Sequence, residues 1–509
     1  MKQIECDEQV KEKIALLITY IVIAIFNILC MCGHELWRDE TQAWLISRDC
    51  SLTAGSLFTV TSYEGHPFLW FLVLMPFSKL GFPVWILKVV SYFFVMGGLF
   101  FLFWKTRFPI LLKILMAFSP MFVCFLVVPA RCYSLAAFLM VIWLIAYDKR
   151  ESRPYFYGIT LALLIQTHTI YAGFVLGACV VWGIEIIIYM INGNKNAQII
   201  FKKITAICIP FFSAVFLLWE FRYTKAAITY HAHDLALNFY EAIKEMEYSF
   251  QLLFGEWSFF CLFALAVLIL YLLVVSKNGW KGFIILAFGL GWQIYVFVFA
   301  ASNANNRGIS WLFIIVAAMN AICDDWKSGS NYSLINIGEN NYCTYVFFYI
   351  VIILFLSMQY NVSTLRSEIS YDSLYSQGKE IAEVINELPK DSAIFITVSD
   401  FDSPVSSQVD DSHVVYSPFS KSRASYMDRN PANEETMKFE ELKSVIFQMF
   451  PEQSEAYIVV GVENTNIIGL QEKIADGDND IEIYYFNPCE TTANENYYIL
   501  KLYNDGLRM

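Results

Sequence analysis

Residues 14–44 read "IALLITYIVIAIFNILCMCGHELWRDETQAW" and contain the change in character on which the fold depends. The first 19 residues, Ile14–Cys32, are apolar almost throughout, and a helix needs roughly 20 such residues to cross a membrane. Gly33–Trp44 then brings an arginine, an adjacent Asp-Glu pair and two tryptophans. A solvated turn explains the charges but not the tryptophans, which favour the membrane–water boundary. The stretch therefore predicts a membrane helix followed by a polar segment at the membrane surface.

The whole chain has the composition of a polytopic α-helical membrane protein. Of its 509 residues 57% are hydrophobic and 16% are charged, which is atypical of a soluble globular protein. Apolar runs recur as far as Tyr360. We expect about eleven membrane spans, over residues 14–32, 83–104, 109–128, 133–148, 155–170, 171–191, 203–220, 257–275, 282–301, 309–323 and 343–360.

The run 66–80, "HPFLWFLVLMPFSKL", decides which side of the membrane each loop faces. If it does not span and the N-terminus is cytoplasmic, the cytoplasmic segments hold 15 Lys/Arg and the opposite side up to residue 342 holds 8. Positive charge gathers in cytoplasmic loops. We therefore expect a juxtamembrane helix at 66–80 and a long first outer loop, 33–82, outside the cytoplasm.

The end of the chain differs sharply in charge from the rest. Residues 361–509 carry 11 Lys/Arg and 26 Asp/Glu, a net of −15, while the whole chain carries −12. This acidity makes nucleic acid an improbable partner. Helical spacing over 373–388 and 434–450, with strand patterns at 393–398, 456–461, 481–486 and 497–503, predicts a small α/β fold. We expect a transmembrane domain, 1–360, and an extracytoplasmic α/β domain, 361–509.

The sequence offers little to hold a metal ion. Twelve cysteines are scattered, mostly in apolar runs, without a CxxC pair, which indicates packing rather than metal binding. The stretch "HAHD" supplies His231, His233 and Asp234 as candidate ligands, but no fourth ligand is identifiable. We therefore expect no metal and no other cofactor.

Asp39 and Glu40 are the first candidates for chemistry. Two adjacent carboxylates do not both face one reacting atom unless the backbone turns there, so one can act as a general base while the other is structural. The alternative is that Asp39 is the N-cap of a helix formed by "ETQAWLIS". Residues alone do not decide between the two.

Further candidates lie where predicted spans meet the outer side. Arg131, Arg307 and Lys88 are cations that can bind phosphate, or else reach towards lipid headgroups. Five others are candidate substrate-binding residues, although His66-Pro67 also suits the start of a helix and His168 suits a polar cap. They are Arg38, Glu64, His66, Tyr133 and His168.

Taken in order, "RDE" (38–40), "HPF" (66–68) and "ARCY" (130–133) resemble a known set of motifs. The chain is similar over about 10–320 to the GT-C class of integral membrane glycosyltransferases. It looks most like the glycosyltransferase family 39 group of protein O-mannosyltransferases and lipid A aminoarabinose transferases. Phe68 replaces the family's second proline, and Lys88 stands where the family has arginine. The sugar and the subfamily stay open.

The resemblance implies inverting transfer of a sugar from a polyprenyl phosphate to an acceptor hydroxyl on a glycan, lipid or protein. Asp39 would be the base, and Arg131, Arg307 and Lys88 would stabilise the leaving phosphate. The setting would be a prokaryotic plasma membrane, with the site extracytoplasmic. A transporter or lipid flippase is the alternative, and it would predict paired charges at mid-membrane and an inverted repeat.

Overall fold

The computed structural model describes most of the chain, in two compact units. The described residues are 2–222 except 54, 120–121, 124–126 and 193–195; 278–299; 307–322; 375–504 with short gaps at 398–401, 431–435, 463–465, 478–479, 490 and 492–494; and scattered positions in 239–267 and 349–353. Unit 1 comprises Met1–Cys32, Gly65–Leu69 and Val90–Arg366. Unit 2 comprises Gly33–Glu64, Trp70–Val89 and Ser367–Met509.

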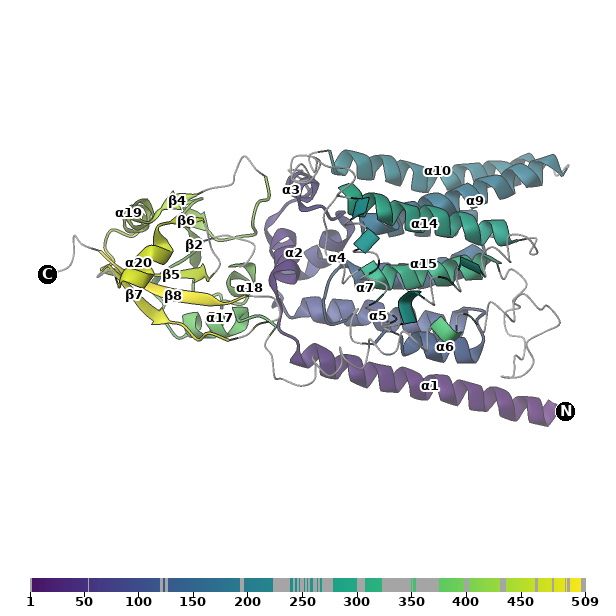
Figure 1. Ribbon diagram of the computed structural model, residues 1–509, viewed down its shortest axis with the longest axis horizontal. Coiled ribbons are helices and arrows are strands. Elements are labelled where there is room, and N and C mark those ends of the chain that lie inside the picture. Colours follow the sequence, from purple (N-terminus) through teal and green to yellow (C-terminus); the bar gives the residue numbers. More distant parts are fainter. Residues whose placement is uncertain are drawn as a thin grey trace. The chain divides into compact units, whose positions relative to one another are not determined.

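Unit 1 is helical (Figure 1). Within it α8 packs against α7 and α10, and α14 packs against α9 and α15. Most of α5 belongs to this unit as well. The helices are α1 (Lys2–Gly33), α5 (Ile86–Lys105), α6 (Ile110–Ala117), α7 (Cys132–Asp148), α8 (Pro154–Ile165), the short 3-10 helix η1 (Thr169–Tyr171), α9 (Ala172–Ile191), α10 (Ala197–Glu220), α14 (Gly279–Phe299) and α15 (Arg307–Ile322).

Glycine allows two of these helix pairs to approach closely. A Cβ on Gly158 of α8 would lie 2.3 Å from the carbonyl oxygen of Ala206 on α10. A Cβ on Gly173 of α9 would lie 2.1 Å from the Cβ of Trp292 on α14. Small residues at such crossings are typical of helices in membranes, where van der Waals packing drives helix association.

Four helices of the described chain are long and apolar enough to cross a membrane: Gln9–Gly33, Ile86–Lys105, Thr169–Ile191 and Ala197–Glu220. Shorter apolar helices lie at Leu69–Lys79, Cys132–Asp148, Pro154–Ile165 and Leu312–Ala321. An apolar helical membrane protein is thus confirmed, whereas the expected number of eleven spans is not. The predicted spans 257–275 and 343–360 lie largely outside the described residues.

Two predicted spans were too long. The predicted helix over 109–128 ends at Ala117, and Ser119 precedes Pro120 in the sequence, a position that disfavours the α conformation. The predicted helix over 155–170 ends at Ile165, where Gln166 turns the chain and donates to the carbonyl of Ser213, 2.9 Å away. Hydropathy registered both runs but could not register these breaks.

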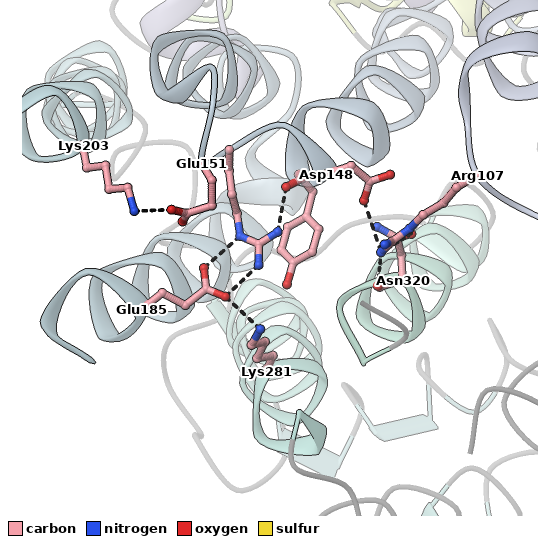
Figure 2. Close-up of polar contacts among 9 residues, drawn as sticks. Arg107, Asp148, Glu151, Glu185, Lys203, Lys281 and Asn320 are labelled. Carbon is pink, nitrogen blue, oxygen red and sulfur yellow. Dashed lines mark hydrogen bonds and ion pairs between the residues drawn. The ribbon is translucent and has the colours of Figure 1, made fainter. Parts of the chain in front are cut away.

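A network of ion pairs joins the helices of unit 1 where α7 ends (Figure 2). Arg150 donates twice to Glu185 of α9, at 2.8 and 2.7 Å, and Lys281 of α14 reaches the same carboxylate at 2.9 Å. Nearby, Arg107 pairs with Asp148 at 3.2 Å and donates to the carbonyl of Asn320 at 3.0 Å. Lys203 of α10 pairs with Glu151.

Unit 2 is built around a six-stranded mixed sheet (Figure 1). Its strand order is β3-β2-β1-β5-β8-β7, in which β1 pairs in parallel with β2 and β5, and β8 runs antiparallel to β5 and β7. The strands are β1 (Ala393–Ile396), β2 (Val415–Ser417), β3 (Ser422–Arg423), β5 (Glu455–Gly461), β7 (Ile481–Tyr485) and β8 (Tyr497–Tyr503). A small second sheet pairs β4 (Met437–Lys438) with β6 (Ile467–Ile468).

Helices flank this sheet, and both of its faces are buried. Ile394 and Ile396 belong to one apolar cluster, with Ile381 of α17, and the alternating Ala393 and Phe395 belong to the other, with Leu442 of α19. These helices are α17 (Gly378–Asn386), α18 (Ser403–Ser406), α19 (Phe439–Met449) and α20 (Leu470–Asp476). The predicted strands 393–398, 456–461, 481–486 and 497–503 are present with small shifts at their ends, so the predicted α/β fold is confirmed.

Unit 2 also takes in most of the predicted first outer loop. The loop forms α2 (Arg38–Asp49), α3 (Ser56–Glu64) and α4 (Leu69–Lys79), and all but Gly65–Leu69 cluster with the sheet-containing part rather than with unit 1. The run 66–80 accordingly forms a separate short helix, α4, which is 11 residues long. The predicted domain boundary at 360/361 remains a prediction.

Candidate active site

The N-cap of α2 lies two residues before Asp39. Trp37 is the N-cap and has extended backbone, so the helix begins at Arg38 and the alternative prediction that Asp39 is the N-cap is wrong. The side chain of Glu40 reaches back and accepts from the backbone N–H of Trp37 at 3.0 Å. This is the reciprocal half of a capping box, in which the third helical residue holds the residue that starts the helix. Asp39 stands beside it and is half-buried.

The side chain of Glu40 is buried inside unit 2, where its carboxylate has protein partners. It is fully buried, and His34 Nε2 donates to the same carboxylate oxygen at 3.1 Å. The His34 ring lies edge-on against Tyr375, with 4.7 Å between ring centroids, and Trp37 contacts the same tyrosine at 5.6 Å. Of the two adjacent carboxylates, Glu40 therefore has the contacts of a structural group, and Asp39 is the better candidate for the base.

The backbone of Arg38 is held by residues from the end of the chain. Its N–H donates to Glu495 Oε1 at 3.0 Å, and its carbonyl accepts from the hydroxyl of Ser403 at 3.1 Å. The hydroxyls of Ser403 and Thr41 lie 3.0 Å apart. α2 thus contacts α18 and the segment just before β8, which lie more than 350 residues away in sequence.

Gln42, one turn further along α2, bonds the helix to the backbone of Met427. Its amide oxygen accepts from the N–H of Met427 at 3.0 Å and its amide nitrogen donates to the carbonyl of Met427 at 2.7 Å. The same nitrogen donates to Glu64 Oε1 at 3.0 Å, and Arg429 pairs with Glu64 at 3.3 Å. Glu64, predicted to bind substrate, thus has structural partners in unit 2.

Lys88 lies in the first turn of α5. Its ammonium donates to the carbonyl of His34, a residue of the short segment between α1 and α2. The charge of Lys88 therefore lies beside the segment that joins α1 to α2, and both belong to unit 2. Its predicted role in binding phosphate stays a prediction.

Unit 1 brings four predicted site residues into one cluster at the start of α7. Arg131 is the N-cap of α7, and its guanidinium donates to His66 Nε2 at 2.9 Å. The guanidinium also lies over the ring of Tyr133, 5.4 Å from its centroid. The ring of His168 stacks on Tyr133 and meets His66 edge-on, with centroids 5.3 Å apart in both pairs. Residues from three separate predicted loops therefore meet.

The hydrogen bonds assign the protons on both imidazoles. A guanidinium can only donate, so His66 Nε2 accepts and the proton of the neutral ring is on Nδ1. His168 Nδ1 accepts from the backbone N–H of Ile170 at 3.1 Å, where it caps η1, so its proton is on Nε2. The polar cap considered for His168 is therefore present. Each neutral ring therefore carries one N–H donor, at Nδ1 of His66 and at Nε2 of His168, and N–H donors can stabilise an oxyanion.

His66 and His168 also form a group with the buried Cys132 in which one ligand atom from each lies within 4.8 Å of the others. Such a trio can hold a metal ion in principle. A neutral imidazole has one nitrogen lone pair, however, and in both rings that lone pair already accepts a hydrogen bond from the protein. The rings as they stand fit an anion better than a cation. The absence of a metal remains a prediction.

For four of the candidate residues the structure describes no side chain. His231, His233 and Asp234 lie outside the described residues, and Arg307 begins α15 without a described side chain. Conversely, sequence reasoning did not single out His34 or Glu495. His34 lies only six residues before Glu40 in the sequence, whereas nothing in the sequence connects Glu495 with α2.

No protein-family model matches the sequence, and no curated protein matches it. Among solved structures, the chain is similar to the crystal structure of ArnT from Cupriavidus metallidurans bound to undecaprenyl phosphate. The sequences are 10% identical, the match covers 95% of this chain and 97% of that chain, and the TM-score is 0.48. A TM-score of 0.48 at this identity establishes neither a shared family nor a shared activity.

Proposed function

We propose that this protein is a membrane glycosyltransferase that moves a sugar from a polyprenyl phosphate to an acceptor hydroxyl with inversion at the anomeric carbon. The motif order of "RDE", "HPF" and "ARCY" supports this class, as do helices long and apolar enough for a membrane. The observation that carries the proposal is the cluster at the start of α7. Motif residues from distant parts of the sequence gather there around a guanidinium.

The cluster has the chemistry that a leaving phosphate needs. Arg131 combines a permanent positive charge with a forked set of donors, and it stands at the N-terminus of α7, where the helix dipole favours anions. The N–H groups assigned to His66 and His168 add neutral donors. Preorganised donors directed at developing negative charge supply a large part of many enzymes' rate acceleration.

The proposed reaction is a single displacement. The carboxylate of Asp39 takes the proton of the acceptor hydroxyl as that oxygen bonds to the anomeric carbon. The bond between the anomeric carbon and the phosphate oxygen breaks at the same time, and the electron pair leaves with the polyprenyl phosphate. Phosphate is a good leaving group without protonation, so the mechanism requires no protein acid. Glu40 is not required as a second base, because it is held by His34 and Trp37.

Single-turnover transfer from a labelled polyprenyl-phosphate sugar tests the base. Asp39→Asn keeps the shape of the side chain but cannot accept the proton, so the rate should fall about 10²–10⁴-fold, the usual contribution of a general base, with donor binding retained. Asp49→Asn is a matched control on the same helix, because Asp49 is occupied by Arg48 and Ser425. A wild-type rate for Asp39→Asn would remove Asp39 from the mechanism.

The phosphate site needs a separate measurement. Arg131→Ala should weaken donor binding and slow transfer together, by about 10²–10³-fold in rate if the guanidinium meets developing charge. Arg107→Ala provides the control, because it also removes an arginine from unit 1 but one that is bonded to Asp148 and Asn320. Equal donor affinity in Arg131→Ala and wild type would reject the phosphate site.

A further inference from the structure

The end of the chain holds the backbone of the residue next to Asp39. Both polar groups of Arg38 are bonded to it: the N–H to Glu495 and the carbonyl to Ser403. Glu495 precedes β8 and Ser403 begins α18, while Arg38 begins α2, and all three belong to unit 2. Figure 1 shows α18 beside α2.

A helix does not need so distant a partner at this place. The first N–H groups of any helix lack an intrahelical acceptor, and a local side chain normally supplies it. Here the fully buried carboxylate of Glu495, 457 residues further along the chain, accepts from the first of them. The bond therefore fixes where α2 begins relative to the sheet, which a local cap cannot do.

A second attachment one turn later fixes the rotation of α2. The amide of Gln42 is paired with both the N–H and the carbonyl of Met427, in the manner of a strand pairing. Asp39 lies between the two attachments and is half-buried. Because the helix is held at both points, the Cα of Asp39 has little freedom to shift along or around the helix axis.

We propose that the C-terminal α/β part positions the general base, with Glu495 and Ser403 as positioning residues that hold the Arg38 backbone and so fix Asp39. This rests on the proposed function, because it takes Asp39 as the base. A displacement of about 1 Å in a reacting group can slow a reaction about 10²-fold even when the substrate binds normally. The positioning residues should therefore affect turnover and leave donor affinity unchanged.

The surroundings of Glu495 make its ionisation costly. Burial raises its pKa to about 7, against the smaller opposing effects of the Ser376 hydroxyl, the Arg38 N–H and the Arg38 charge, while the Asp39 charge raises it further. Burial and, to a smaller extent, the charges of Glu495 and Asp402 raise the pKa of Tyr497, which lies beside them. A buried acid that is costly to ionise thus lies where the first N–H of α2 needs an acceptor.

The test uses the full-length protein in detergent and compares Glu495→Ala, which removes the acceptor of the Arg38 N–H, with wild type. We expect kcat to fall about 10–100-fold while KM for the polyprenyl-phosphate sugar stays within about twofold. Hydrogen exchange of the amides of residues 38–42 should accelerate. Ser403→Ala should give a smaller loss of kcat, and Ser403→Thr, which keeps the hydroxyl, should restore it.

Glu380→Ala is the matched control. Glu380 lies in the same α/β part but bonds to Tyr485 and Asn487 rather than to α2, so its kcat and its exchange at 38–42 should stay at wild-type values. A folded Glu495→Ala variant with wild-type kcat overturns the positioning role while Asp39→Asn still tests the base. If Glu495→Ala does not fold, a wild-type kcat in Ser403→Ala overturns it instead. A wild-type rate in Asp39→Asn overturns the proposed base and this inference together.

Discussion

Glu185 of unit 1 and Glu495 of unit 2 are both kept away from most of the solvent, but their partners differ in kind. Glu185 in unit 1, whose side chain is 15% exposed, meets two cations, Arg150 and Lys281 (Figure 2). Glu495 in unit 2 is fully buried and accepts from the backbone N–H of Arg38. Of these two acids, Glu185 has its charge balanced by two cations that form ion pairs with it, whereas Glu495 contacts a backbone N–H.

The difference indicates different tasks. A buried carboxylate that forms ion pairs with cations from different helices joins those helices. Removing its charge leaves the cations buried without that counter-charge. A buried carboxylate held mainly by hydrogen bonds is easily neutralised, as the pKa of about 7 for Glu495 shows. We interpret the first as a structural anchor of the helices and the second as a group whose ionisation the fold tolerates for positioning. Four measurements can break or sharpen this contrast.

Glu185→Gln should have the largest effect on stability. The substitution keeps the side-chain shape but leaves Arg150 and Lys281 buried beside a neutral amide, and breaking a buried ion pair this way typically costs about 3–5 kcal/mol. We expect a lower midpoint of thermal unfolding in detergent with an unchanged transfer rate at low temperature. A wild-type midpoint would show that the network does not anchor the helices.

Glu495→Gln should raise the stability of the protein, and it should do so at neutral and alkaline pH but not at acidic pH. The folded pKa of about 7 is raised above the ordinary value of 4.5, so wild type loses stability as pH rises through this interval, whereas glutamine does not ionise. The variant should match wild type near pH 4 and be more stable by up to about 3 kcal/mol near pH 8. Unfolding measured at both pH values checks this, and equal stability at pH 8 would reject it.

The pair of Lys203 and Glu151 should show a much smaller coupling. Glu151 is 57% exposed although Lys203 is 2% exposed, so solvent screens the charge of the acid. A double-mutant cycle with Lys203→Met and Glu151→Gln should give a coupling of about 0.5 kcal/mol. Lys203→Met alone should cost more, because Lys203 also lies over the ring of Tyr189, 4.4 Å from its centroid. A coupling energy as large as the stability lost in Glu185→Gln would show that the ion-pair network also anchors α10.

Chelation should have no effect on transfer. Both imidazoles of the His66, Cys132 and His168 group use their lone pairs to accept hydrogen bonds from the protein, so activity should survive EDTA. Transfer with and without the chelator, followed by addition of divalent ions, measures this. Loss of activity with EDTA and recovery with a divalent ion would reassign the cluster at the start of α7 from anion to metal binding.

Sequence patterns were most informative where the chemistry is local. The apolar run before Gly33, the strand patterns of the C-terminal part and the separate helix at 66–80 were all readable, because burial requires apolar residues at fixed spacing. The same patterns failed at 109–128 and 155–170, since hydropathy does not register the breaks after Ala117 and Ile165.

The candidate site was partly readable as well. Arg131, Tyr133, His66 and His168 were singled out because polar residues at the ends of apolar runs are unusual, and they do meet at the start of α7. Two adjacent carboxylates in a sequence do not show that Asp39 is a better candidate for the base than Glu40. That distinction depends on His34 and Trp37 occupying Glu40.

The sequence by itself therefore determined the membrane character, the α/β ending and the residue types available for chemistry, because each depends on composition or on short-range periodicity. Only the tertiary structure decided which partners these residues have. Glu495 meets Arg38 across 457 residues, and Glu185 meets Lys281 across two helices. Such pairings depend on how elements pack, and packing depends on the combined shape of many side chains rather than on any local pattern.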